Sequence, residues 1–168
     1  MEEDREWMLK KARRRAMYLL QRMDRTEENL RQKLLNSYPP DVAEEALEYV
    51  KSYGYVDDER YARNYLAYRI QSKSRQKLFL ELYQKGVARQ TVEDAWAEVS
   101  ALESVDEKEI LRRQICRKYE SGTKLDEKEM RRLYGFLARK GFRWEDIRQV
   151  LDEEGIALER GSDFGKND

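Results

Sequence analysis

The chain has 168 residues, of which 40% are charged, and its 34 basic residues balance 34 acidic ones. It contains no histidine, the commonest general base and transition-metal ligand, and its single cysteine, Cys116, excludes an internal disulfide. No apolar run approaches the roughly 20 residues that cross a bilayer, and the acidic N-terminus is unlike a signal peptide. We therefore expect a cytoplasmic protein that does not enter a membrane.

Apolar residues recur at helical spacing along most of the chain. The periodic segments predict nine helices, over residues 5–23, 27–36, 41–53, 58–72, 75–85, 91–101, 107–120, 127–140 and 144–154. Asp41, Asp106 and Asp126 are expected to cap helix starts. Five glycines are expected to end helices in the left-handed conformation: Gly54, Gly86, Gly122, Gly141 and Gly155. No segment alternates as a strand, so no sheet is predicted, and residues 161–168 are expected to form a frayed tail.

The expected helices group in threes. Residues 82–87 and 137–142 are similar, each carrying Lys-Gly, and each is followed by an apolar helix that begins at the same spacing. The first group has Tyr-Pro-Pro at the corresponding place, which is typical of a divergent terminal repeat. The sequence thus predicts an all-α fold of three stacked repeats with a C-terminal tail. Their expected bounds are 1–56, 57–104, 105–155 and, for the tail, 156–168.

Charge is segregated along the chain although the total is balanced. Residues 41–59 and 91–109 each hold seven acidic residues and one basic residue. Residues 60–90 hold eight basic residues and one acidic residue, and such a block favours an anionic partner, either DNA or an acidic protein surface. A second set of basic residues recurs on the first helix, where a solvated face opposite the core is the simpler interpretation. The candidate partner-binding residues are Arg60, Arg69, Lys73, Arg75 and Lys77, then Lys11, Arg15, Arg22 and Arg25.

Other chemistry-bearing residues have plainer interpretations. Asp57-Asp58-Glu59 precedes a helix, which favours capping over metal binding. Cys116 is expected to be a small packed hydrophobe, and Trp96 to lie in the core. Tyr61, Tyr65 and Tyr68 follow helical spacing, which favours packing over a stacking surface for single-stranded nucleic acid. We predict no catalytic residue, metal or cofactor, and hence no enzyme.

The middle repeat resembles a known family. Residues 55–63 read Tyr-Val-Asp-Asp-Glu-Arg-Tyr-Ala-Arg, and a leucine helix ending in Lys-Gly-Val and the apolar helix around Trp96 follow. This stretch resembles the RecX family of bacterial recombination regulators, specifically over residues 53–100 and more loosely over 8–155. One departure is Ser-Lys-Ser at residues 72–74, where the family often has Gly-x-Gly; serine also suits a helix start.

The resemblance implies a function. RecX-like proteins form elongated, curved helical arrays that bind the RecA recombinase. They lodge along the groove of the RecA–single-stranded DNA filament and suppress strand exchange, ATP hydrolysis and coprotease activity, which places them in DNA repair and the SOS response. We expect a monomer with the same partners. A helical protein that binds DNA directly remains an alternative, because three-helix units can resemble helix-turn-helix modules. A structural adaptor without a nucleic-acid role is a third.

Overall fold

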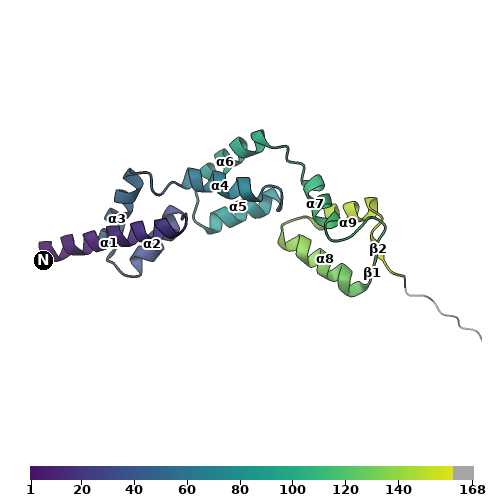
Figure 1. The fold of residues 1–168 in the computed structure, drawn as a ribbon, viewed down its shortest axis with the longest axis horizontal. Coiled ribbons are helices and arrows are strands. Elements are labelled where there is room, and N and C mark those ends of the chain that lie inside the picture. The colour runs from purple at the N-terminus through teal and green to yellow at the C-terminus, as the bar shows by residue number, and fades with distance from the viewer. Residues whose placement is uncertain (161–168) are drawn as a thin grey trace, which may run out of the picture. The chain divides into compact units, whose positions relative to one another are not determined.

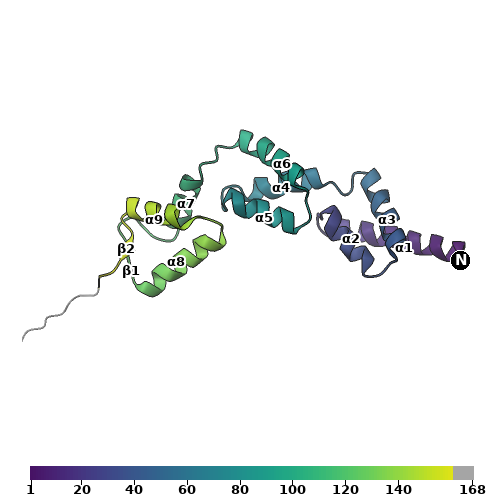
Figure 2. The same cartoon turned by 180° about the vertical axis from the view of Figure 1, so that it is seen from behind.

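The structure, a computed structural model, describes residues 1–160. Within this range it contains nine helices (Figures 1 and 2), which confirms the all-helical class and the grouping in threes. The helices are α1 (Glu2–Arg22), α2 (Glu27–Leu35), α3 (Pro40–Ser52), α4 (Asp58–Arg69), α5 (Arg75–Gln84), α6 (Arg89–Leu102), α7 (Glu107–Cys116), α8 (Glu127–Arg139) and α9 (Trp144–Glu153). The expected frayed tail, 161–168, lies outside the described residues.

The prediction that no sheet forms is wrong in one place. Strand β1 (Lys124–Leu125) pairs in parallel with β2 (Ala157–Leu158), and each strand has two residues, too few for an alternating pattern to be visible in the sequence. The Gly122 N–H also donates to the Glu154 carbonyl at 2.8 Å. Ile156, where the tail was expected to begin, is buried, and it belongs to the core of the third repeat.

The chain divides into two compact units. Within the described residues, unit 1 comprises 1–68 and 78–104, and unit 2 comprises 69–77 and 105–160. In unit 1, α1 packs along α3, and Ala12, Ala16 and Ala46 are fully buried, so small side chains let the two helices approach closely. In unit 2, α7, α8 and α9 enclose a separate apolar core around Leu111, Ile115 and Leu137.

Trp96 is less buried than predicted, and Met23, the last residue of the first expected helix, lies outside α1. Met23 is 58% exposed, because α1 ends at Arg22 and Met23 begins the connection to α2. Trp96 is half-buried rather than enclosed, and its ring meets the edge of Phe79 with 5.6 Å between centroids. Trp96 therefore packs within unit 1 while part of its large indole stays in solvent.

Helix starts follow the predicted capping at two of three positions. Asp106 accepts from the backbone N–H groups of α7, and Asp126 forms a reciprocal capping box with Glu129 on α8. The expectation for Asp41 is wrong, because α3 starts one residue earlier, at Pro40, whose missing N–H needs no cap. The Asp41 carboxylate instead accepts from Arg5 Nε at 3.0 Å.

The start of α2 is joined to the second repeat by two hydrogen bonds inside unit 1. The Thr26 hydroxyl donates to the Lys85 carbonyl at 2.7 Å and also accepts from the Asn29 N–H, so it caps α2. The Glu27 N–H donates to the Asp58 carboxylate at 2.9 Å. Thr26 is 1% exposed, so both of its bonds are protected from water.

The start of α5 repeats this arrangement inside unit 2. The Ser74 N–H donates to the Lys140 carbonyl at 3.0 Å, while the Ser74 hydroxyl caps α5 by accepting from the Lys77 N–H. The Arg75 N–H donates to Glu107 Oε1 at 2.6 Å. At each junction, the residue whose hydroxyl caps the second helix of one repeat contacts the Lys-Gly turn of the next repeat. A carboxylate from the first turn of a helix in that next repeat accepts from the backbone N–H of the residue after the cap. Serine at 74 fulfils this role without the family's glycine.

Two glycines make the junctions possible. Gly86 and Gly141 have φ values of 85° and 89°, and a Cβ atom on either would overlap the second-helix start packed on it. At Gly141 the overlapped groups are the Ser74 and Lys77 side chains. The Lys-Gly pairs seen in the sequence are thus contact points between repeats as well as helix ends.

We predict that Gly141→Ala destabilises the protein more than Gly54→Ala does. Both residues have positive φ, which costs an alanine about 1–2 kcal/mol, but a Cβ on Gly54 meets no atom within 4 Å. Overlap at Gly141 should add about 1–3 kcal/mol. Urea unfolding of both variants measures the difference, and equal losses would show that residue 141 is only a helix terminator.

Candidate partner-binding surfaces

Two side chains of the family-like motif in the middle repeat, residues 55–63, form hydrogen bonds with backbone groups of the chain. Asp57 caps its own helix by accepting from the Arg60 N–H at 3.1 Å. The Arg60 guanidinium donates to the carbonyls of Gly54 and Tyr55, at 3.0 and 3.5 Å, where α3 ends. The Asp57 contact confirms the capping interpretation for this residue of the acidic run. Arg60, a candidate for partner binding, is thus engaged in closing the turn between α3 and α4.

Asp58 is a half-buried carboxylate at the unit 1 junction. Its burial raises its pKa, and the nearby charges of Glu27 and Asp57 raise it further, whereas the hydrogen bond from the Glu27 N–H and the charge of Lys51 lower it. The side chain therefore accepts its hydrogen bond at an electrostatic cost when it is ionised.

The acidic third helices are partly neutralised by basic residues of their own repeat. Arg5 on α1 pairs with Asp41 and Glu45, and Arg31 on α2 pairs with Glu44 of α3. These contacts raise the pKa of both arginines. The other repeats have equivalent pairs: Arg63 with Glu98 at 3.7 Å, and Arg112 with Glu153. The segregation of charge along the sequence is thus partly cancelled in space.

The basic face of α1 lacks such pairing. Lys11, Arg15 and Arg22 are exposed, and none forms an ion pair with a described residue. Lys11 Nζ lies 3.8 Å from the centre of the Trp7 ring, and Arg22 donates to the Tyr18 hydroxyl at 2.6 Å. Arg15 lies 5.5 Å from the Tyr18 ring. Aromatic side chains contact these cations, and no described carboxylate pairs with them, so their charges are available to an outside partner.

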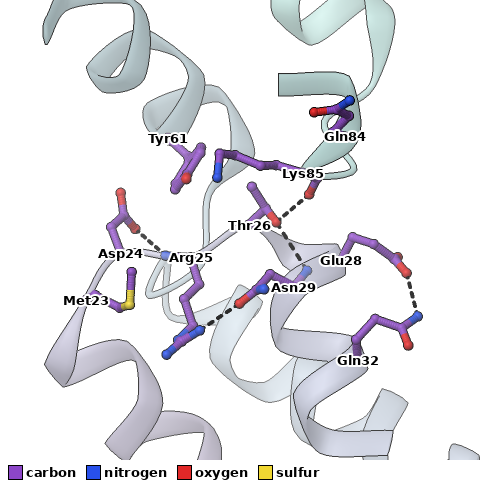
Figure 3. Close-up of a pocket in the computed structure, with 10 residues that line it drawn as sticks. All are labelled: Met23, Asp24, Arg25, Thr26, Glu28, Asn29, Gln32, Tyr61, Gln84 and Lys85. Carbon is purple, nitrogen blue, oxygen red and sulfur yellow. Dashed lines mark hydrogen bonds between the residues drawn. The ribbon is translucent and has the colours of Figure 1, made fainter. Parts of the chain in front are cut away.

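Arg25, expected on the same stripe, lies beyond the end of α1 and faces a pocket of about 390 Å³ in unit 1 (Figure 3). Its guanidinium donates to Asn29 Oδ1 at 2.8 Å and to the Leu19 carbonyl at 3.4 Å. Lys85 and Tyr61 line the same pocket beside the Thr26 junction. Arg25 therefore closes the α1–α2 connection through these two hydrogen bonds.

The middle basic block lies around the start of α5. Lys77 packs against Gly141, and the Arg75 backbone contacts Glu107. Arg69, Lys73 and Arg75 each have an interaction partner within the chain, so these side chains also serve contacts of the chain itself.

Two further expectations, for the three tyrosines and for Cys116, have mixed outcomes. Tyr61 and Tyr65 are half-buried and stacked, with 6.1 Å between centroids, whereas Tyr68 is 86% exposed and so does not belong to the core. Cys116 is exposed, contrary to the packed role expected, and desolvation and Glu154 raise the pKa of its thiol.

Among the residues that the structure describes, no group of three or more potential metal ligands gathers. Nor does any helix within residues 1–160 have the length and apolar character needed to span a membrane.

The fold defines a class of protein, the tandem three-helix repeat proteins. Family models for the first, second and third three-helix domains of RecX match residues 12–49, 57–95 and 106–151. The chain belongs to the RecX family of regulatory proteins.

Relatives and solved structures agree with this assignment. The protein named regulatory protein RecX of Streptomyces coelicolor is 33% identical, over 94% of this chain and 86% of its own length. Those of Vibrio vulnificus and Clostridium botulinum are 31% and 30% identical, over 83% and 85% of this chain and 90% and 68% of their own lengths. The crystal structure of RecX from Lactobacillus salivarius matches with a TM-score of 0.64 at 21% identity, covering 88% of this chain and 96% of that one, which supports the fold.

We predict that Asp58→Asn preserves stability at neutral pH, whereas Asp58→Ala loses about 1 kcal/mol, because the asparagine oxygen still accepts from the Glu27 N–H. The pKa of Asp58 is raised on folding, so wild type should lose stability relative to Asp58→Asn as pH rises from about 4, the unfolded pKa, through the folded value. Urea unfolding at pH 4 and pH 7 tests both statements. An asparagine variant as unstable as the alanine variant at pH 7 would show that the charge stabilises the junction.

Proposed function

We propose that the protein binds RecA, chiefly as the RecA–single-stranded DNA filament, and inhibits its recombinase, ATPase and coprotease activities. The observation that carries the proposal is family membership across all three repeats, each matched by its own RecX domain model. The relatives are named as regulatory proteins, and a regulator of this kind needs binding faces rather than a reaction centre.

The surface chemistry supports a large, charged partner. The filament carries both DNA phosphates and protein carboxylates, and exposed cations that form no ion pair with a carboxylate of the chain are suited to either. On the first helix, Lys11, Arg15 and Arg22 meet this description. The middle set, Arg69, Lys73, Arg75 and Lys77, stays part of the proposal, but its members also serve contacts within the chain.

The direct test is ATP hydrolysis by RecA on single-stranded DNA, with this protein titrated in. Inhibition that saturates, together with binding to the filament and none to RecA-free DNA at the same concentration, would support the proposal. An unchanged ATPase rate at concentrations far above that of RecA would contradict it. If inhibition rises only in proportion to the binding of this protein to naked DNA, the result would favour the direct DNA-binding alternative.

We predict that the triple reversal Lys11→Glu, Arg15→Glu, Arg22→Glu raises the concentration needed for half-inhibition by about tenfold or more, since charges at an interface mainly set its association rate. The exposed positions should leave the fold intact, because surface changes usually alter stability by about 0.5 kcal/mol or less. Circular dichroism and thermal unfolding check this.

The matched control reverses three exposed cations of the third repeat, Lys124, Lys128 and Arg131, with the same change in net charge. We expect a smaller effect from it. If the control weakens inhibition as much as the α1 variant does, the effect reflects net charge, and α1 is not the binding face.

A further inference from the structure

An open groove in unit 2 has no role in the proposed RecA contact. It has a volume of about 780 Å³ and is lined by residues of α8 and α9, with Ala157 and Leu158 of β2. We call it the α8–α9 groove. Two of its large apolar side chains face solvent, because Trp144 is 62% exposed and Leu158 is 48% exposed. A hollow that leaves such side chains uncovered is typical of a binding site.

The middle repeat has a larger side chain at the corresponding place. Aligning the two Lys-Gly pairs puts Leu151 of the groove opposite Trp96, and Tyr134 opposite Phe79. Trp96 packs against Phe79, with 5.6 Å between their ring centroids. Leucine is smaller than tryptophan, so the third repeat keeps an open groove where the middle repeat has an aromatic contact of its own.

Charged side chains follow a fixed order along the groove. The parallel pairing of β1 with β2 holds the start of α8 beside the end of α9, so Glu127 and Asp152 belong to the same end of the groove. Arg131 and Arg148 lie one turn farther along the two helices. Starting from β2, the groove therefore presents carboxylates first and guanidinium groups next.

The aromatic rings of the groove come after the arginines. Tyr134 and Trp144 have 4.2 Å between their ring centroids. Burial raises the pKa of Tyr134, the charge of Asp152 raises it further and that of Arg148 lowers it, so both charges act on the phenol. Within residues 1–160, neither Arg131 nor Arg148 forms an ion pair, which leaves both guanidinium groups for a carboxylate from elsewhere.

The chain that follows β2 carries the complementary order. Arg160 is exposed and comes two residues after Leu158. Beyond it, outside the described residues, the sequence continues with Asp163 and then Phe164, the one large apolar residue of the segment 161–168. Counted from β2, the segment thus offers a cation, a carboxylate and a ring, to match carboxylates, guanidinium groups and rings.

We propose that the C-terminal segment folds back along the α8–α9 groove of its own molecule, with Phe164 against the rings of Tyr134 and Trp144. Asp163 then lies beside the arginines, and Arg160 beside the carboxylates at the β2 end. The groove is closed by the chain itself, and an apolar segment of any other molecule would have to displace Phe164. This inference does not depend on RecA binding, and either can fail alone.

The length of the segment fits this path. Six residues separate Leu158 from Phe164 and span at most about 20 Å when extended, whereas α8 advances about 10 Å from Glu127 to Tyr134. A tethered segment also has an effective concentration in the millimolar range, so a contact made by one ring and one charge pair forms more readily than with a free peptide. Both arguments favour the chain's own segment over that of a second copy.

The test is NMR spectroscopy of the full-length chain labelled with ¹⁵N, with no RecA present. Wild type should give nuclear Overhauser cross-peaks between the ring protons of Phe164 and Trp144. Phe164→Ala should shift the indole N–H signal of Trp144, which is assigned with Trp144→Phe, and should leave that of Trp7 in unit 1 in place. Thermal unfolding verifies that each variant is folded.

The charge contact has a matched control in the same segment. Asp163→Asn should move the Trp144 signal toward its position in Phe164→Ala, whereas Asp168→Asn, which removes the same charge, should not. Three results would overturn the proposal: no cross-peaks together with an unmoved Trp144 signal in Phe164→Ala, equal effects of the two asparagine variants, or cross-peaks that disappear on dilution. The last result would show that the segment of a second copy occupies the groove.

Discussion

The structure depends on one contact, made twice: the hydroxyl-capped start of a second helix packs on the Lys-Gly turn that ends the second helix of the next repeat. Thr26 meets Lys85 in unit 1, and Ser74 meets Lys140 in unit 2. Each three-helix group has a small core, and such groups gain stability by stacking. Glycine is required where the backbones approach, which explains why the Lys-Gly pair recurs in the two repeats that receive a neighbour.

Internal pairing decides which charges remain for a partner. The acidic third helices contact arginines of their own repeat, as Arg31 does with Glu44, so a long acidic block in the sequence is not an acidic surface of equal extent. On the α1 face, Lys11, Arg15 and Arg22 form no ion pair with a carboxylate of residues 1–160. A partner that binds through charge would therefore contact fewer residues than the composition implies.

Much of the fold could be predicted from the sequence, because 3.6-residue periodicity, aspartate caps and glycine stops act locally, as at Asp126 and Gly141. The β1–β2 pairing could not, since two-residue strands leave no pattern. The sequence located the basic residues but did not show which of them bind groups of the chain itself and which remain for a partner. Arg60 and Arg25 bind carbonyl groups that lie within six residues along the chain, while Lys140 contacts Gln114 of α7, which lies 26 residues away. Cys116 and Tyr68 were misplaced because helical spacing identifies a face without showing whether another helix covers it.

The central claim is that this chain acts on the RecA filament. The most direct measurement is co-sedimentation of the protein with RecA–single-stranded DNA filaments assembled on a nucleotide that RecA cannot hydrolyse, in parallel with free RecA and with naked DNA. The account predicts saturable pelleting with the filament, and far less with either component alone. Pelleting with naked DNA equal to that with the filament, or none with the filament at any concentration, would contradict it.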